Sequence, residues 1–202
     1  MLLPVSYTTR LPRGSEQNGR EYYFVARTEF EDMIARDEFL EYADVFGNWY
    51  GTARRFLREA EQNRHDLLLD IDVQGAEQIK RKLPQAVSIF ILPPHRKELE
   101  RRLRKRSVDA EDVIQRRLVT ATREIENYRK YDYILINDRL EESIDALKAI
   151  LLAERQKRSE LHLSTDDKEM LAKAERWRLG NVQAQLQPIL ASFAAAAVPG
   201  GR

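Results

Sequence analysis

The chain has 202 residues, with 34 Lys+Arg against 33 Asp+Glu, a formal net charge of +1 and no cysteine. Without cysteine it holds no disulfide framework and no cysteine-ligated metal site. A net charge this close to zero gives no global field, which disfavours a general nucleic-acid coat protein. Hydrophobic residues make up 43% of the chain, enough for an ordinary core. We therefore expect one folded domain, or one domain with an appendage.

Membrane and secretory signals are missing from the sequence. No apolar run is long enough to cross a bilayer, and the opening Met1-Leu2-Leu3-Pro4 is too short and too uncharged for a signal peptide. We expect a cytoplasmic protein with no membrane partner. The sequence carries no signal of the oligomeric state.

The first third of the chain predicts short strands and loops, because glycines and prolines separate short runs such as residues 22–25. A helix is expected to begin near Thr28, which forms a capping box with Glu31. A second helix is expected over about residues 53–62.

Further along, strands and helices alternate. Nearly continuous apolar runs at residues 67–71, 87–92 and 133–136 are typical of strands buried on both faces of a parallel sheet. Helical patterns lie between and after these runs, at about residues 74–82, 97–106, 110–130 and 140–158. The alternation predicts an α/β fold.

The remaining residues, 159–202, are interpreted as a helical C-terminal appendage. Ser164 is expected to cap a charged helix that ends near Gly180. An Ala-rich segment follows this helix, and the sequence assigns it no function.

Two arginines three residues apart, Arg10 and Arg13, follow the hydroxyl-rich segment 6–9. A planar guanidinium group grips two phosphate oxygens at once, so this pattern suits an anionic ligand. Tyr22 and Tyr50 would add hydroxyl donors. The alternative is a strand end with exposed arginines and half-buried tyrosines.

An acidic residue in an aromatic-rich stretch, Glu41, predicts selectivity for guanine if it lines a base pocket. An ionised carboxylate only accepts hydrogen bonds. Guanine presents its N1–H and its N2 amine side by side, whereas adenine offers no such pair of donors. Ser6 and Thr52 would then donate to guanine O6. The alternative is a solvated glutamate at a strand end.

Two acids, Asp70 and Asp72, stand at and just beyond the end of the 67–71 run, which predicts that they share one face of a strand. Ligands of α/β sheets bind outside the carboxyl ends of such strands. A carboxylate there can hold Mg²⁺ through water or orient a bound nucleotide. The alternative is a pair of helix-capping acids ahead of Gly75.

A basic stretch at residues 101–106 is followed by Arg116 and Arg117 on the next predicted helix. It is a solvated helix face, a nucleic-acid patch, or a mobile arginine lid that closes over a transferring phosphoryl group. The lack of interleaved aromatic residues and the balanced charge argue against nucleic acid. The three histidines show no ligand spacing, so no side chain is assigned to a metal.

Five segments together closely resemble the guanylate kinase family, over about residues 5–155. They are Val5-Ser-Tyr-Thr-Thr-Arg-Leu-Pro-Arg13, Phe39-Leu-Glu41, Gly47-Asn-Trp-Tyr-Gly51, Leu69-Asp-Ile-Asp-Val-Gln-Gly75 and Ile136-Asn-Asp138. Their order along the chain is far more specific than any one segment. The resemblance implies a P-loop-kinase-like parallel sheet flanked by helices, with a small mixed GMP-binding subdomain and a helical lid.

The resemblance also implies a reaction and its residues. The family transfers the γ-phosphoryl group of ATP, with Mg²⁺, to GMP and forms ADP and GDP. Its GMP-site positions are matched by Ser6, Arg10, Arg13, Tyr22, Glu41, Tyr50, Thr52 and Asp72, with Asp70 close by. Its catalytic lid and phosphate-contacting arginines are matched by Arg102, Arg106 and Arg117, and Asn137 matches a position near the adenine of ATP. The implied kinase-like domain is residues 1–158, with the GMP-binding part within about 5–72 and the lid at about 101–117.

One departure from the family pattern concerns the P-loop, because no G-x-x-x-x-G-K-[ST] occurs in the 202 residues. Met1 falls where the family would already have passed its first strand, P-loop and first helix. We therefore expect this chain to lack that strand and the backbone N–H cradle for the donor phosphates, and to transfer phosphate poorly alone. The alternative function is a GMP-binding or partner-binding module. The lid arginines and Asn137 argue against that alternative.

Overall fold

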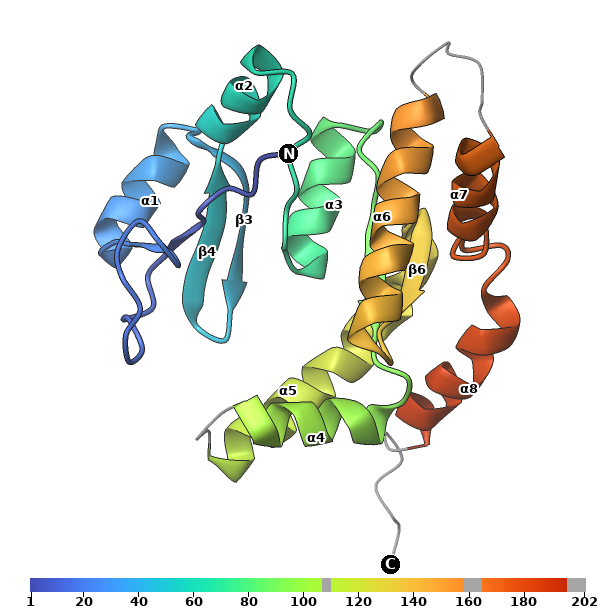
Figure 1. The fold of residues 1–202 in the computed structure, drawn as a ribbon. Coiled ribbons are helices and arrows are strands. Elements are labelled where there is room, and N and C mark those ends of the chain that lie inside the picture. The colour runs from blue at the N-terminus through green and yellow to red at the C-terminus, as the bar shows by residue number, and fades with distance from the viewer. Residues whose placement is uncertain (107–109, 158–164, 196–202) are drawn as a thin grey trace, which may run out of the picture. The chain divides into compact units, whose positions relative to one another are not determined.

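The computed structural model describes residues 1–106, 110–157 and 165–195. The chain divides into two compact units, Met1–Ala86 and Val87–Arg202, and each is described by itself. Figure 1 shows their helices and strands. Among the described helices, none combines the length and the apolar character that crossing a bilayer requires.

The first unit contains a mixed four-stranded sheet and three helices. Its elements are β1 (Tyr7–Thr8), β2 (Tyr23–Phe24), α1 (Arg27–Ala35), β3 (Phe39–Val45), β4 (Asn48–Ala53), α2 (Arg55–Gln62) and α3 (Val73–Lys82). The strand order is β2-β1-β4-β3, which leaves β3 at one edge of the sheet. β1 pairs in parallel with β2, and the other pairs are antiparallel.

A tight turn at Phe46 and Gly47 joins β3 to β4. Both residues have positive φ, 54° and 84°, as a two-residue type I′ hairpin turn requires. The hairpin pairs Glu41 with Thr52 across the two strands. Two predicted site residues are thereby brought side by side.

Helix α1 packs on this sheet through Phe30 and Met33, which are buried with Phe39 of β3. The helix begins at Arg27 after an extended Ala26, which makes no side-chain cap. The predicted capping by Thr28 is therefore wrong, because Thr28 lies inside the first turn.

The predicted strand at residues 67–71 is also wrong. Within the described residues, Leu67 makes an isolated parallel bridge to Leu2, and the neighbouring leucines are half-buried. A strand needs a ladder of successive hydrogen bonds with a neighbour, and one bridge does not provide it. Asp70 and Asp72 therefore lie in the segment that leads into α3.

The second unit is built on a parallel pair of strands with helices around it. Its elements are β5 (Ile89–Leu92), α4 (Arg96–Arg106), α5 (Glu111–Glu124), the 3-10 helix η1 (Ile125–Lys130), β6 (Tyr133–Ile136), α6 (Leu140–Lys157), α7 (Thr165–Glu175) and α8 (Gln183–Ala194). β5 and β6 pair in parallel, which confirms two predicted strands, and α4 packs beside α5 (Figure 1). The helices and the two sheets make this an α/β protein.

The helices α7 and α8 contribute to the hydrophobic core of the second unit. Val182, Leu186, Ile189 and Phe193 are buried in one cluster with Leu92, Ile125, Tyr128 and Ile134. Ala174 of α7 is buried in a second cluster with side chains of β6 and α6. The predicted appendage therefore contributes buried side chains to the core, as far as its residues are described. Its Ala-rich composition concealed α8.

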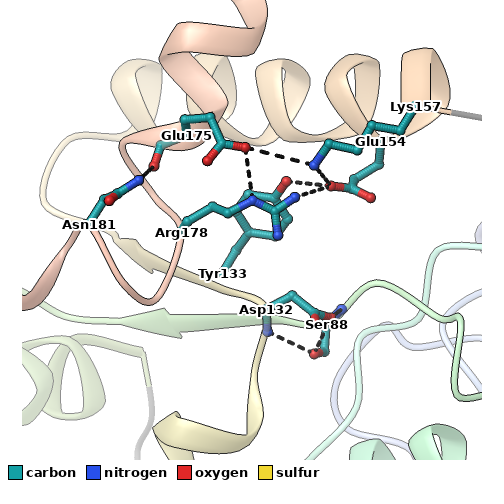
Figure 2. Close-up of polar contacts among 8 residues, drawn as sticks. All are labelled: Ser88, Asp132, Tyr133, Glu154, Lys157, Glu175, Arg178 and Asn181. Carbon is teal, nitrogen blue, oxygen red and sulfur yellow. Dashed lines mark hydrogen bonds and ion pairs between the residues drawn. The ribbon is translucent and has the colours of Figure 1, made fainter.

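Polar contacts also join this segment to β6 and α6 (Figure 2). The Tyr133 hydroxyl donates to Glu154, and Arg178 donates to Glu154 and to Glu175 at 2.9 Å each. The Arg178 guanidinium lies 4.6 Å from the centre of the Tyr133 ring. Burial and the Glu154 carboxylate raise the pKa of Tyr133, so its hydroxyl stays a donor.

Replacing Phe193 with alanine is expected to destabilise the second unit by about 3–5 kcal/mol, because it leaves a cavity in the core. Chemical denaturation measures the loss. Gln187→Ala, an exposed change in the same helix, is the control. Equally small effects of the two substitutions would contradict a core role for α8.

Candidate functional site

A pocket of about 490 Å³ lies within the first unit. Its walls come from β3, β4 and the segments before β1, β2 and α3. Because side chains alternate along a strand, Glu41, Ala43 and Val45 of β3 face the pocket together. The predicted GMP-site residues that line it are Ser6, Tyr22, Glu41, Tyr50, Thr52, Asp70 and Asp72.

Glu41 is the buried acid of this pocket, with 4% of its surface exposed. Burial raises the pKa of its carboxyl and the charge of Asp72 adds to this, whereas hydrogen bonds from the Thr52 hydroxyl and backbone N–H lower it. An ionised carboxylate offers about four acceptor sites, so Thr52 leaves capacity for a ligand. The alternative of a solvated glutamate at a strand end is wrong.

The missing side chain of Gly75 makes room for this carboxylate. A Cβ at Gly75 would lie 2.6 Å from Glu41 Oε2 and 3.3 Å from Ile71 Cβ. The Gly75 N–H donates to Asp72 Oδ1 at 2.8 Å, so Asp72 is the N-cap of α3 as well as a wall of the pocket. The sequence showed this glycine as part of a motif, and its close approach to Glu41 is a tertiary contact.

Four hydroxyl-bearing residues line the pocket together with apolar side chains such as Val45 and Leu69. The Ser6 and Thr52 hydroxyls lie 3.4 Å apart. The Tyr22 and Tyr50 rings pack edge to face with their centres 5.8 Å apart. Burial raises the pKa of Tyr22, which keeps its hydroxyl a donor. The pocket therefore offers hydrogen-bond donors beside one buried acceptor.

Arg10 lies next to the pocket and is held by Glu16, a residue that the sequence analysis missed. Its guanidinium lies 5.5 Å from the centre of the Tyr22 ring and donates to both Glu16 carboxylate oxygens at 3.0 Å. Arg13 is exposed, and its backbone N–H also donates to Glu16. Among the described contacts, Arg10 contacts Tyr22 of the pocket wall, whereas Arg13 makes no contact with a wall residue. Glu21 is a further wall residue that was not predicted.

The other predicted residues belong to the second unit. Arg102 donates to Glu98 at 2.7 Å and to the Asp138 carbonyl oxygen at 3.4 Å, which places it beside the loop that carries Asn137. The Asn137 side chain accepts from the Ser143 hydroxyl at 3.2 Å. Arg117 is half-buried on α5. Arg106 is the last residue of α4, and its side chain lies outside the described part of the structure.

Several arginines of the basic stretch form ion pairs along their own helices. Arg101 pairs with Glu98 at 2.7 Å. Arg104 pairs with Glu100 at 2.8 Å and also with Glu111 of α5 at 2.6 Å. Arg116 pairs with an acid four residues earlier. For these side chains the structure favours a solvated helix face among the three interpretations.

Comparison with known proteins shows what the chain resembles. The model of the guanylate kinase family matches residues 1–154. A guanylate kinase of Koribacter versatilis is 55% identical over 198 residues, which cover 96% of this chain and 85% of that protein. A guanylate kinase of Escherichia coli is 50% identical over 151 residues, 75% of this chain and 73% of that protein. The crystal structure of guanylate kinase from Anaplasma phagocytophilum matches with a TM-score of 0.65 at 39% identity, over 76% of this chain and 74% of that chain.

Proposed function

Because the chain belongs to the guanylate kinase family, we propose that its pocket binds GMP and that the protein transfers the γ-phosphoryl group of ATP to GMP. A phosphate oxygen of GMP attacks the γ-phosphorus as the bond to the ADP leaving oxygen breaks, which yields GDP and ADP. The buried acceptor Glu41 carries the proposal.

The base is read by the deep end of the pocket. The Glu41 carboxylate accepts from guanine N1–H and N2–H, and Ser6 and Thr52 donate to guanine O6. Adenine has an acceptor at N1 and no amine at C2, so AMP would leave the buried carboxylate without donors. An unpaired buried charge is costly, and this cost selects against AMP.

The phosphate of GMP is assigned to the donors at the pocket rim. Arg10 supplies a guanidinium group beside the pocket, and the Tyr22 and Tyr50 hydroxyls add neutral donors. The exposed Arg13 is assigned a second guanidinium contact on the family pattern alone. In this structure the Arg10 guanidinium donates hydrogen bonds to Glu16. When GMP binds, its phosphate either accepts further hydrogen bonds from the same guanidinium or displaces the Glu16 carboxylate from it.

The lid residues act on the donor nucleotide. Arg102, Arg106 and Arg117 stabilise the negative charge that spreads over the transferring phosphoryl oxygens. Asn137 contacts the adenine of ATP. These four assignments rest on the family pattern and stay predictions.

If Mg²⁺ is bound together with ATP, it would neutralise part of the phosphate charge. Magnesium usually keeps several waters and binds through one or two carboxylates and the substrate phosphates. The described residues hold no group of three acids or histidines that forms a metal site by itself, and the exposed Asp70 supplies a carboxylate at the pocket wall. This donor set fits a nucleotide-borne ion. The expectations of a cytoplasmic location and of no nucleic-acid partner stay predictions.

Titration of the protein with GMP and with AMP tests the acceptor site. We expect GMP to bind saturably and AMP to bind at least about 100-fold more weakly than GMP. Equal affinities would contradict the assignment of the base pocket. Identities of 50–55% to guanylate kinases favour the enzyme over a binding module. Formation of GDP from ATP and GMP is the assay that separates these two functions. Because the 202 residues contain no P-loop motif, we expect slow transfer, and no detectable GDP would favour the binding module.

The affinity for GMP is expected to rise with pH as Glu41 ionises. Burial raises the pKa of Glu41 in the free protein, and only the ionised form accepts both guanine donors. Binding therefore releases a proton wherever Glu41 is protonated, and affinity falls as the pH drops through that raised pKa. The GMP phosphate itself titrates near pH 6, so Glu41→Gln is the control that retains this contribution. Identical pH profiles of the two proteins would argue against an ionised Glu41 as the base acceptor.

A further inference from the structure

A side chain of helix α3 forms hydrogen bonds with the edge of strand β3 that no other described strand pairs with. β3 is the last strand of its sheet, so alternate backbone groups point away from β4. The Gln78 amide donates to the Tyr42 carbonyl oxygen at 2.6 Å and accepts from the Tyr42 N–H at 3.3 Å. One glutamine thus pairs with both backbone groups of an edge residue, as a neighbouring strand would.

The donation to a β3 carbonyl oxygen recurs one helical turn away in each direction. Gln74 Nε2 donates to the Asp44 carbonyl oxygen at 3.2 Å, and Lys82 Nζ donates to the Leu40 carbonyl oxygen at 2.6 Å. Four residues of helix rise about 6 Å, and two residues of strand rise about 6.6–6.8 Å. The repeats match, so every fourth residue of α3 meets every second residue of β3. We name Gln74, Gln78 and Lys82 the α3 ladder.

The α3 ladder joins the two elements that carry the acids of the pocket. Glu41 lies between the two β3 residues that Lys82 and Gln78 hold. Asp72 caps α3 and accepts from Gln74 Nε2 at 3.1 Å. The Glu41 carboxylate sits against Gly75 at the start of the same helix. A shift of β3 relative to α3 would therefore change how deep this carboxylate lies.

Charge adds to this geometric link. Desolvation lowers the pKa of Lys82, although the residue as a whole is exposed. Its positive charge in turn lowers the pKa of Glu41. Lys82 therefore favours the ionised form of Glu41 that accepts hydrogen bonds.

We propose that the α3 ladder is a positioning device that sets the depth of the Glu41 carboxylate, and thereby the discrimination between purine monophosphates with and without an amine at C2. The inference rests on the proposed GMP-binding function. None of the three ladder residues belongs to the described lining of the pocket. They act through β3 and are positioning residues.

Titrations with GMP and inosine monophosphate, which keeps N1–H and lacks the amine, test the proposal. Gln78→Met and Lys82→Met are expected to lower the ratio of GMP to inosine monophosphate affinity about tenfold or more. Inosine monophosphate makes one of the two hydrogen bonds to Glu41, so its affinity is expected to fall less than that of GMP. Lys82→Arg keeps a donor and is expected to restore most of the ratio. Arg81→Met, an exposed change of the same kind on α3, is expected to leave it unchanged.

Two results would overturn the α3 ladder as a positioning device. One is an unchanged ratio in both methionine variants. The other is an equal loss of affinity for both nucleotides, which indicates general destabilisation of the unit. If Gln78→Met does not fold, the comparison of Lys82→Met with Lys82→Arg decides. Failure of the proposed function is a different result, in which the unmodified protein itself does not prefer GMP over AMP.

Discussion

Replacing Glu41 with glutamine is expected to abolish the preference for GMP over AMP while the protein stays folded. The amide presents an N–H₂ group to a guanine donor, and the charged acceptor is lost. A hydrogen bond to a charged group contributes about 1.5–3 kcal/mol, so losing two lowers the GMP preference by about 100-fold or more. The fold is expected to survive, because the substitution also removes a buried charge whose desolvation is unfavourable.

Parallel titrations with GMP and AMP, together with a denaturation curve, measure both effects. The control is Glu31→Gln, which makes the same chemical change on the exposed face of α1. A Glu41→Gln protein that keeps its GMP preference would place the base recognition elsewhere in the pocket.

Replacing Gly75 with alanine is expected to lower GMP affinity by about tenfold or more, since the new Cβ would lie 2.6 Å from Glu41 Oε2. The carboxylate is buried, so it cannot turn into solvent without leaving its Thr52 donors. Alanine favours a helix over glycine by about 1 kcal/mol, which offsets part of the clash in the free energy of unfolding. We therefore expect Gly75→Ala to lower the affinity for GMP more than it lowers the free energy of unfolding.

A double-mutant cycle with Glu41→Ala tests whether the clash is with Glu41. In that background the space beside Gly75 is free, so Gly75→Ala should have little further effect on nucleotide binding. Gly180→Ala is the control, because nothing lies within 4 Å of a Cβ built there. Additive losses from the two substitutions would show that Gly75 acts independently of the carboxylate.

The fold was predictable where local patterns decide the structure. Apolar runs marked β5 and β6, and helical spacing marked α2, α3, α4 and α6 to within about two residues at most ends. The pattern failed where tertiary contacts decide. The apolar run at residues 67–71 predicts a buried strand, but among the described residues it forms a single β-bridge. Helix α8 was not predicted because its sequence is rich in alanine, although Leu186 and Phe193 are core side chains.

The sequence was enough to predict most of the polar residues that line the candidate pocket. It was not enough to predict the contacts that hold these residues in place. The sequence motifs placed Glu41, Thr52 and Asp72 together, and one pocket contains all three. The ion pair of Arg10 with Glu16 and the α3 ladder depend on how loops and helices meet. Gln78 and Lys82 look like ordinary polar positions of an amphipathic helix, because their partners are backbone atoms, which sequence patterns do not mark.

A crystal structure of this protein with GMP bound is the most direct test of base recognition by Glu41. We expect the guanine to enter the pocket of the first unit, with N1 and N2 at hydrogen-bond distance from the Glu41 carboxylate and the phosphate at Arg10. A guanine that binds outside this pocket, or one that turns N1 and N2 away from Glu41, would contradict this expectation.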